Sequence, residues 1–282
     1  MKPLRALALL GVAVIAGLAL GRIGPFAPPS QWPFQNVLGT YDRGTLQRGF
    51  HVYTEVCAAC HSLNMVAFHD LAASGGPGFS NDEVKAIAAG YRIPAEPDER
   101  GETVDDHGTR LTRPGIPADH FPSPFGNEQA ARLENGGALP PDLSLIVKAR
   151  PGGPDYVYGV LTGFGQTPPA GFKLPEGRYY NPHVPGGIIA MPPPLVAGMV
   201  RFADGTPATL DNEARAVTTF LAWAAEPELE TRHRLGFEVL AFLGLLAGLL
   251  FFTYRKVWRE KSPPAVPVVT ADAAAEDSTV SE

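Results

Sequence analysis

The two cysteines of this 282-residue chain stand three positions apart, and a histidine follows the second one directly. The resulting string is Cys57-Ala58-Ala59-Cys60-His61. A Cys-x-x-Cys pair can form a redox disulfide, provide half of a zinc site or attach a haem. A zinc ribbon needs a second cysteine pair, and a thioredoxin-like motif needs a strand–helix–strand context, which the helical, Gly- and Pro-rich flanks do not offer. The histidine after the pair is typical of covalent haem attachment.

The chemistry of haem attachment explains this spacing. Each thiol adds across one vinyl group, so that two thioether bonds fix the macrocycle to the backbone, and the adjacent histidine supplies a neutral imidazole nitrogen to the iron. We therefore predict one covalent haem c, bound through Cys57 and Cys60, with His61 as an axial ligand of the iron.

The second axial ligand must come from a distant part of the sequence. Met65 is only four residues from His61 and would lie on the same side of the ring. Met199 stands in an apolar run, where a core role is the default for methionine. Met191 stands in the loop Ile-Ile-Ala-Met-Pro-Pro-Pro, whose prolines fix φ and would hold the thioether rigidly. Our prediction is Met191, with His183 as the strongest rival, because methionine opposite histidine raises the haem potential and suits electron transfer.

A second feature is the apolar stretch Leu235 to Tyr254, twenty residues with one charge, Glu238. At a rise of about 1.5 Å per residue, a helix of this length spans the roughly 30 Å of a bilayer's hydrocarbon core. No polar face interrupts the stretch, which predicts a single C-terminal transmembrane helix. Four basic residues follow it, which predicts a cytoplasmic tail over residues 255–282: Arg255, Lys256, Arg259 and Lys261.

The N-terminus resembles a secretory signal. Met1 to Arg5 carries two positive charges, and Ala6 to Leu20 is apolar without interruption. We predict that residues 1–21 are a signal peptide, cleaved after Gly21, or an uncleaved anchor. Residues 22–231 would then form a haem domain on the periplasmic side of a bacterial inner membrane, which is the side on which haem is joined to such proteins.

The secondary structure is predicted to be mainly α, with long loops, since 29 prolines and 31 glycines occur without a period. Periodicity and capping signals predict helices over 42–56, 81–90, 127–134, 143–149, 156–162 and 211–225. The helix at 81–90 would begin at a cap formed by Asn81 or Asp82, and 91–125 and 163–194 are predicted loops. An early helix that leads into the haem motif and a late helix with an aromatic residue, Trp223, are typical of class I cytochromes c.

The chain is mildly acidic, with a formal net charge of −6 and a pI of about 5.7. Nothing in this composition indicates nucleic-acid binding, and an acidic surface would favour a basic protein partner. Six carboxylates gather in residues 96–106, where they form either a solvated surface loop or a docking surface for such a partner: Glu96, Asp98, Glu99, Glu102, Asp105 and Asp106.

Five stretches, in order, resemble the cytochrome c1 family: RGFHVYTEVC at 48–57, GALPPDLS at 137–144, MPPP at 191–194, DGTPAT at 204–209 and FLAWAAEP at 220–227. The resemblance covers most of residues 37 to 260. It implies the haem c subunit of the cytochrome bc1 complex, a quinol–cytochrome c oxidoreductase. Such a subunit accompanies cytochrome b, takes electrons from the Rieske iron–sulfur protein and passes them to a soluble or tethered cytochrome c. It carries electrons and is not an enzyme by itself, so no catalytic residue is expected.

Carried over residue by residue, the resemblance again gives Cys57 and Cys60 as attachment points and His61 and Met191 as axial ligands. It further implies that four residues line the haem: Asn135, Pro141, Arg150 and Tyr156. Arg150 and Tyr156 are able to hydrogen-bond a haem propionate. The second cysteine pair of some bacterial members is absent here.

Two other classes of function compete with this interpretation. One is a self-standing, membrane-tethered cytochrome c that feeds an oxidase, although such proteins usually place fewer residues around the haem. The other is a haem enzyme such as a peroxidase, which needs an open coordination position on the iron. A methionine ligand at Met191 would close that position.

Overall fold

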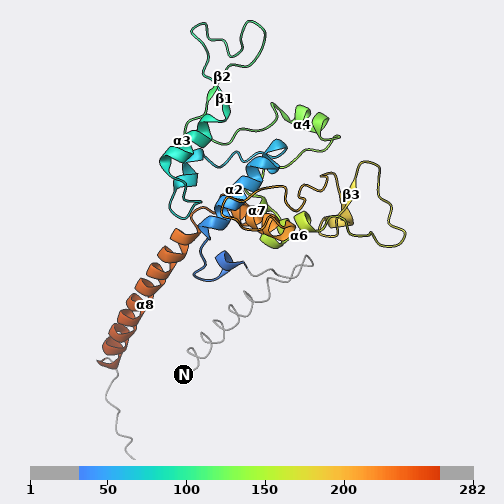
Figure 1. Cartoon of the computed structure of the whole chain (residues 1–282). Coiled ribbons are helices and arrows are strands. Elements are labelled where there is room, and N and C mark those ends of the chain that lie inside the picture. Colours follow the sequence, from blue (N-terminus) through green and yellow to red (C-terminus); the bar gives the residue numbers. More distant parts are fainter. Residues whose placement is uncertain (1–31, 261–282) are drawn as a thin grey trace, which may run out of the picture. The chain divides into compact units, whose positions relative to one another are not determined.

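The computed structural model describes residues 32–260, which are mainly helical with two short two-stranded sheets (Figure 1). Two compact units make up the chain, Met1–His233 and Arg234–Glu282. The predicted mainly α fold is confirmed. The predicted signal segment, residues 1–21, and the tail beyond residue 260 lie outside the described residues.

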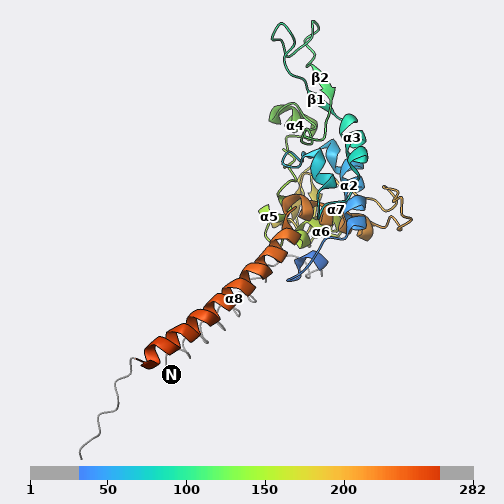
Figure 2. The ribbon, with the colours of Figure 1, turned by 90° about the vertical axis from the view of Figure 1, so that its left-hand side faces the viewer.

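Two helices form the centre of the first unit. Helix α2, Arg43–Glu55, packs against helix α7, Leu210–Ala225, and the two lie side by side in both views (Figures 1 and 2). They approach each other closely at Gly49, where an added Cβ would lie 2.1 Å from the carbonyl oxygen of Ala216. A glycine is therefore required at this position, since any larger side chain would force the two helices apart.

The ends of both helices are fixed by polar side chains. Asp42 caps α2 by accepting the N–H of Thr45, and Thr209 caps α7 by accepting the N–H of Asn212. Such caps satisfy backbone donors that have no partner within the helix. The predicted bounds of 42–56 and 211–225 therefore agree with the structure to within a residue at each end.

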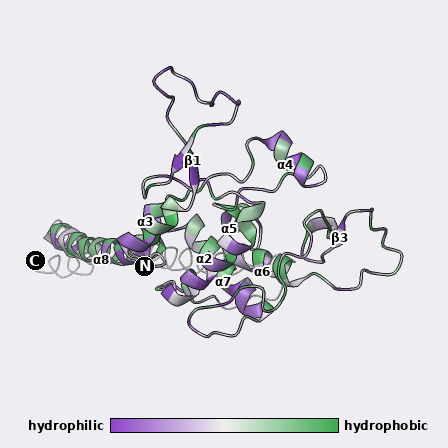
Figure 3. Ribbon diagram, turned by 45° about the horizontal axis from the view of Figure 1, so that its top comes forward, coloured by the Kyte–Doolittle hydropathy of each residue, from purple (hydrophilic) through white to green (hydrophobic). Residues whose placement is uncertain are grey.

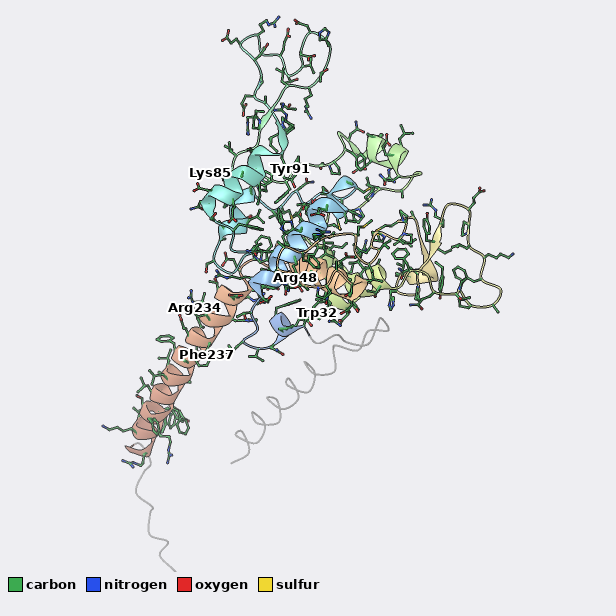
Figure 4. All side chains as sticks on the ribbon, viewed as in Figure 1. Trp32, Arg48, Lys85, Tyr91, Arg234 and Phe237 are labelled. Carbon is green, nitrogen blue, oxygen red and sulfur yellow. The ribbon has the colours of Figure 1, made fainter. Side chains whose placement is uncertain are left out.

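An ion pair joins α2 to the segment before α7. Arg48 of α2, labelled in Figure 4, pairs with Asp204, whose other carboxylate oxygen accepts the N–H of Thr206 at 3.0 Å. Two stretches that resembled the same family, at 48–57 and 204–209, are thus in contact in the folded chain.

Aromatic side chains fill the core around these helices. Phe50, Tyr53, Phe121 and Phe220 are buried and contact one another edge-on or tilted, with ring centroids 5.8 to 6.3 Å apart. Helix α7 is buried on nearly every side from Glu213 to Ala225, and not on the single face expected for an amphipathic helix. The reason is that α2 covers one side while α5 and α6 cover another.

The remaining helices of the first unit are short. They are α3, Asn81–Ala89; α4, Glu128–Glu134; α5, Ile146–Ala149; α6, Pro154–Thr162; and the 3₁₀ turns η1, Pro33–Gln35, η2, Cys57–Ala59, η3, Phe68–Ala72, and η4, Pro185–Gly187. The predicted cap of α3 was wrong. Ser80 caps it in a reciprocal capping box with Glu83. Helix α6 begins two residues before the prediction, because Pro154 suits the first helical position.

The segments predicted as loops contain two hairpins. Strand β1, Arg92–Pro94, pairs antiparallel with β2, Thr112–Pro114, and β3, Tyr179–Tyr180, pairs antiparallel with β4, Ile188–Ile189. The loop prediction was wrong at these four places, because strands of two or three residues are too short to show an alternating pattern. Figure 3 shows mostly hydrophilic residues in the long connection from β1 to β2.

The base of the β1–β2 hairpin is fixed by a two-pronged ion pair. The guanidinium of Arg113 donates to both carboxylate oxygens of Asp119, at 2.6 and 2.7 Å. These hydrogen bonds lower the pKa of Asp119 to about 2, so the carboxylate stays charged at all ordinary pH values. The hairpin is therefore a projecting element with an anchored stem.

The second unit holds most of helix α8, Leu229–Glu260. Over Leu229–Arg259 the helix is long and apolar enough to cross a membrane, with a mean hydropathy of 2.3 in its most apolar window. Between residues 234 and 259 its side chains are exposed, including Phe237 at 67% (Figure 4). The predicted span at 235–254 lies inside this helix.

Candidate haem-binding site

The Cys-x-x-Cys-His motif forms a tight turn directly after α2. The backbone N–H groups of Cys60 and His61 both donate to the carbonyl of Cys57, at 3.1 and 2.9 Å. One turn thus presents the two thiols and the imidazole. Both cysteines are free, Cys60 is exposed and Cys57 is half-buried. Burial raises the pKa of the Cys57 thiol to about 12, with a smaller contribution from Cys60, so Cys57 is a neutral thiol at pH 7.

The ring of His61 is oriented by a backbone carbonyl. Its Nδ1–H donates to the oxygen of Pro141 at 2.8 Å. This bond selects the tautomer in which Nε2 carries the lone pair. Nε2 is therefore the atom that can bind a metal. Burial lowers the pKa of His61, which keeps the imidazole neutral at pH 7. The donor set of this turn therefore fits a covalent haem whose iron is bound by Nε2.

The carboxylate of Asp142 ties this turn to the segment that contains Pro141. It accepts the hydroxyl of Ser62 at 2.8 Å, the N–H of Asn64 at 2.9 Å and the N–H of Ser144 at 2.8 Å. Burial raises the pKa of Asp142, but these hydrogen bonds outweigh it and hold the pKa below its usual value. A charged Asp142 therefore fixes the segment whose carbonyl orients His61.

Two further hydrogen bonds join the same two segments, residues 62–65 and residues 142–144. The N–H of Leu143 donates to the carbonyl of Ser62 at 2.9 Å, and the hydroxyl of Ser144 accepts the N–H of Met65 at 3.1 Å. Sequence reasoning named Pro141 but missed the roles of Asp142 and Ser144. Their only signal was the stretch GALPPDLS, which carried the family resemblance but showed no partner.

The candidates for the second axial ligand occupy different environments. Met191 is half-buried in the loop that follows β4. Met65 and Met199 are 65% and 52% exposed, so the default core role of Met199 was wrong. The ring of His183 packs against α6, since a Cβ on Gly159 would lie 2.9 Å from its Cγ. Met191 as the second ligand stays a prediction.

The other predicted haem-lining residues lie on three separate elements. Asn135 ends α4, where its side-chain amide donates to the carbonyl of Ala131 at 2.7 Å. Arg150 ends α5 and is exposed, and Tyr156 is half-buried on α6 against the core. Of the four residues, the structure brings Pro141 into contact with the motif. A haem-lining role for Asn135, Arg150 and Tyr156 stays a prediction.

A mainly helical fold in which a Cys-x-x-Cys-His turn follows an early helix, with the histidine oriented by a carbonyl, defines a protein of the c-type cytochrome class. The model of the Cytochrome C1 family matches residues 32–261. This chain belongs to the cytochrome c1 family, and the resemblance drawn from its sequence is confirmed.

Curated relatives agree with this assignment. The chain is 46% identical to "Cytochrome b/c1" of Bradyrhizobium diazoefficiens over 91% of its own length and 40% of that relative. It is 44% identical to "Cytochrome c1" of Rhodospirillum rubrum, covering 91% of this chain and 97% of the relative. It is 47% identical to "Cytochrome c1, heme protein, mitochondrial" of Saccharomyces cerevisiae, covering 83% of this chain and 73% of the relative.

Proposed function

We propose that this chain is the electron-transfer subunit of a quinol–cytochrome c oxidoreductase, the bc1 complex, and that it carries one covalent haem c. The single observation that carries the proposal is the motif turn, in which His61 is held by Pro141 in a chain of the cytochrome c1 family. The chain carries electrons and is not an enzyme by itself. The alternative of a self-standing tethered cytochrome is not favoured by this family membership.

Different residues of the site would attach the haem, bind its iron and orient the imidazole. A bound haem c supplies a one-electron couple. Cys57 and Cys60 would hold it through two thioethers, and Nε2 of His61 would bind the iron. Asp142 and the carbonyl of Pro141 hold the imidazole in the required tautomer. The Met191 thioether would supply a second ligand to the iron, which would exclude other ligands and favour the reduced state.

The proposed partners follow from the family. The name of the Bradyrhizobium relative joins a cytochrome b to c1, and this chain matches only 40% of that protein, which supports a cytochrome b as a neighbour of this chain. By family resemblance, the Rieske iron–sulfur protein would deliver electrons, and a soluble or tethered cytochrome c would accept them.

Helix α8 would anchor the haem domain in a bacterial inner membrane. The basic residues Arg255, Lys256 and Arg259 follow its apolar stretch and favour a cytoplasmic C-terminal side. Residues 22–231 would then lie in the periplasm, with residues 1–21 as the export signal or a second anchor.

The native complex provides the test of this function. The membranes are extracted with mild detergent, and the complex is purified by affinity through this chain. We expect a b-type cytochrome to co-purify and the sample to reduce cytochrome c with quinol as the electron donor. The haem spectra of the purified sample measure the ratio of b-type to c-type haem. A chain that purifies with its c-type haem but without b-type haem or quinol oxidation would support the self-standing alternative.

The acidic residues of the β1–β2 hairpin divide into two kinds. Asp98 accepts the N–H groups of Arg100 and Glu102 at 2.8 and 2.9 Å, so this carboxylate shapes the loop. Asp105 likewise accepts the N–H groups of His107 and Thr109. The carboxylates of Glu96, Glu99, Glu102 and Asp106 are exposed and form no such turn, although Asp106 lies 3.8 Å from the guanidinium of Arg100. Exposed carboxylates of this kind can act on a partner through their charge.

We predict that replacing Glu96, Glu99 and Glu102 by Gln and Asp106 by Asn slows reduction of a basic acceptor cytochrome c. At low salt the second-order rate is expected to fall about tenfold or more, because long-range steering is lost. The parent rate should fall as salt rises, since the reach of exposed charges shortens to about 8 Å at physiological salt. Stopped-flow kinetics over a salt series measures both effects.

The matched control removes four exposed acids elsewhere: Asp82, Glu128, Glu176 and Glu228. It changes the net charge equally and is expected to slow the reaction much less. Equal slowing by both sets would mean that only net charge matters. A rate that ignores salt and the hairpin charges alike would show that the hairpin is a solvated loop.

A further inference from the structure

The short hairpin before Met191 is tied together by one buried asparagine. Asn181 is fully buried and directly follows strand β3. Its N–H donates to the carbonyl of Gly187 at 3.0 Å, which closes the hairpin just before β4. Its side-chain Oδ1 accepts the N–H of His183 at 3.0 Å. The asparagine thus fixes the internal shape of the connection from β3 to β4.

The same side chain fastens the hairpin to a helix of the core. Nδ2 of Asn181 donates to the carbonyl of Val160 at 2.7 Å. Val160 lies in the last turn of α6, where backbone carbonyls have no partner within the helix. Helix α6 in turn packs against α7. The hairpin is therefore seated on the frame that also carries α2 and the haem motif.

Gly159 of α6 and Gly163, which directly follows the helix, leave space for the hairpin. A Cβ on Gly163 would lie 2.8 Å from Oδ1 of Asn181 and 2.6 Å from Cδ2 of His183. A Cβ on Gly159 would lie 2.9 Å from Cγ of His183. The hairpin thus approaches the backbone of α6 more closely than any larger residue on the helix would allow. His183 is consequently a packing residue of this contact.

The position of the hairpin determines where Met191 lies. Met191 follows Ile189 of β4 by two residues, a reach of at most about 7 Å. Beyond it, three prolines restrict the backbone up to Leu195, which is buried in the core. A stiff segment with one end on β4 and the other in the core transmits a displacement of β4 directly to Met191.

We propose that Asn181 is a positioning residue for the second axial ligand: by seating the β3–β4 hairpin on α6, it holds the Met191 thioether where the haem iron requires it. This inference rests on the proposed function, in which Met191 binds the iron. It goes beyond that function by assigning the ligand's position to a contact between Asn181, Val160 and two glycines.

The test perturbs the contact from both sides in the intact complex. Asn181→Asp replaces the donor to Val160 by a second acceptor while keeping the acceptor for His183, and Gly163→Ala fills the seat from the helix. Both variants are expected to lower the haem potential, to weaken the red absorption band of methionine-ligated ferric haem and to let the reduced haem bind carbon monoxide. Haem content per chain should stay unchanged, because the thioethers do not depend on the hairpin.

The control is Tyr179→Phe, which alters an exposed side chain of the same hairpin and is expected to change none of these readouts. The variant Met191→Leu distinguishes the ligand role of Met191 from the positioning role of Asn181. If Met191→Leu leaves the potential unchanged, the proposed ligand is wrong. If Met191→Leu lowers the potential while Asn181→Asp and Gly163→Ala leave the potential and carbon monoxide binding at parental values, Met191 is the ligand and the positioning role of Asn181 is refuted.

Discussion

Replacement of both cysteines, Cys57→Ala with Cys60→Ala, is expected to abolish covalent haem and with it the assembled complex. The motif turn packs on the core through Cys57 and Ala58, and the hydroxyl of Tyr53 donates to the carbonyl of His61 at 3.3 Å. A haem attached at Cys57 and Cys60 would adjoin this part of the core, so loss of the haem is expected to weaken the packing there. The measurements are haem retained by the denatured chain and the amount of complex in the membrane.

The parent protein sets the reference for this experiment. Its denatured chain should keep the haem through acid–acetone extraction and exceed its sequence mass by one haem. A matched control is Ala59→Ser, an exposed position in the same turn that leaves both thiols and His61 in place. Loss of haem from the parent under extraction, or full haem retention in the double variant, would contradict covalent attachment at these cysteines.

The features that sequence reasoning recovered are those encoded locally. The bounds of α2 follow from Asp42 as a cap and from apolar residues spaced by one helical turn, and the attachment motif is five consecutive residues. Local patterns of this kind need no knowledge of the rest of the fold. The apolar stretch within α8 was likewise readable, because it is continuous and of bilayer length.

What sequence reasoning missed depends on residues far apart in the chain. Asp142 contacts Asn64 across 78 positions, and Asn181 contacts Val160 across 21. A single sequence carries no signal for such pairs. The hydrogen bonds that orient His61, and the contact between the β3–β4 hairpin and α6, were therefore visible only in the structure.

The prediction that Met199 is a core residue was wrong for a related reason. Its apolar neighbours indicated a buried side chain, but the N–H of Met199 donates to the carbonyl of Val196 in a turn, and the side chain is 52% exposed.

Removal of the Met191 thioether is expected to have the largest effect on the redox chemistry. In Met191→Leu or Met191→Lys, the haem potential should fall by a sizeable part of the roughly 0.8 V range that axial ligands cover, because the sulfur that favours ferrous iron is gone. Redox titration of the complex measures the fall, and electron delivery to the acceptor cytochrome should stop.

Met199→Leu is the matched control. The Met199 side chain is 52% exposed, and the haem potential of this variant should stay close to that of the parent. His183 packs against α6, so His183→Ala should lower the potential less than Met191→Leu does. A larger fall in Met199→Leu or His183→Ala than in Met191→Leu would assign the second ligand to that residue, and the loop after β4 would then have no part in binding the iron.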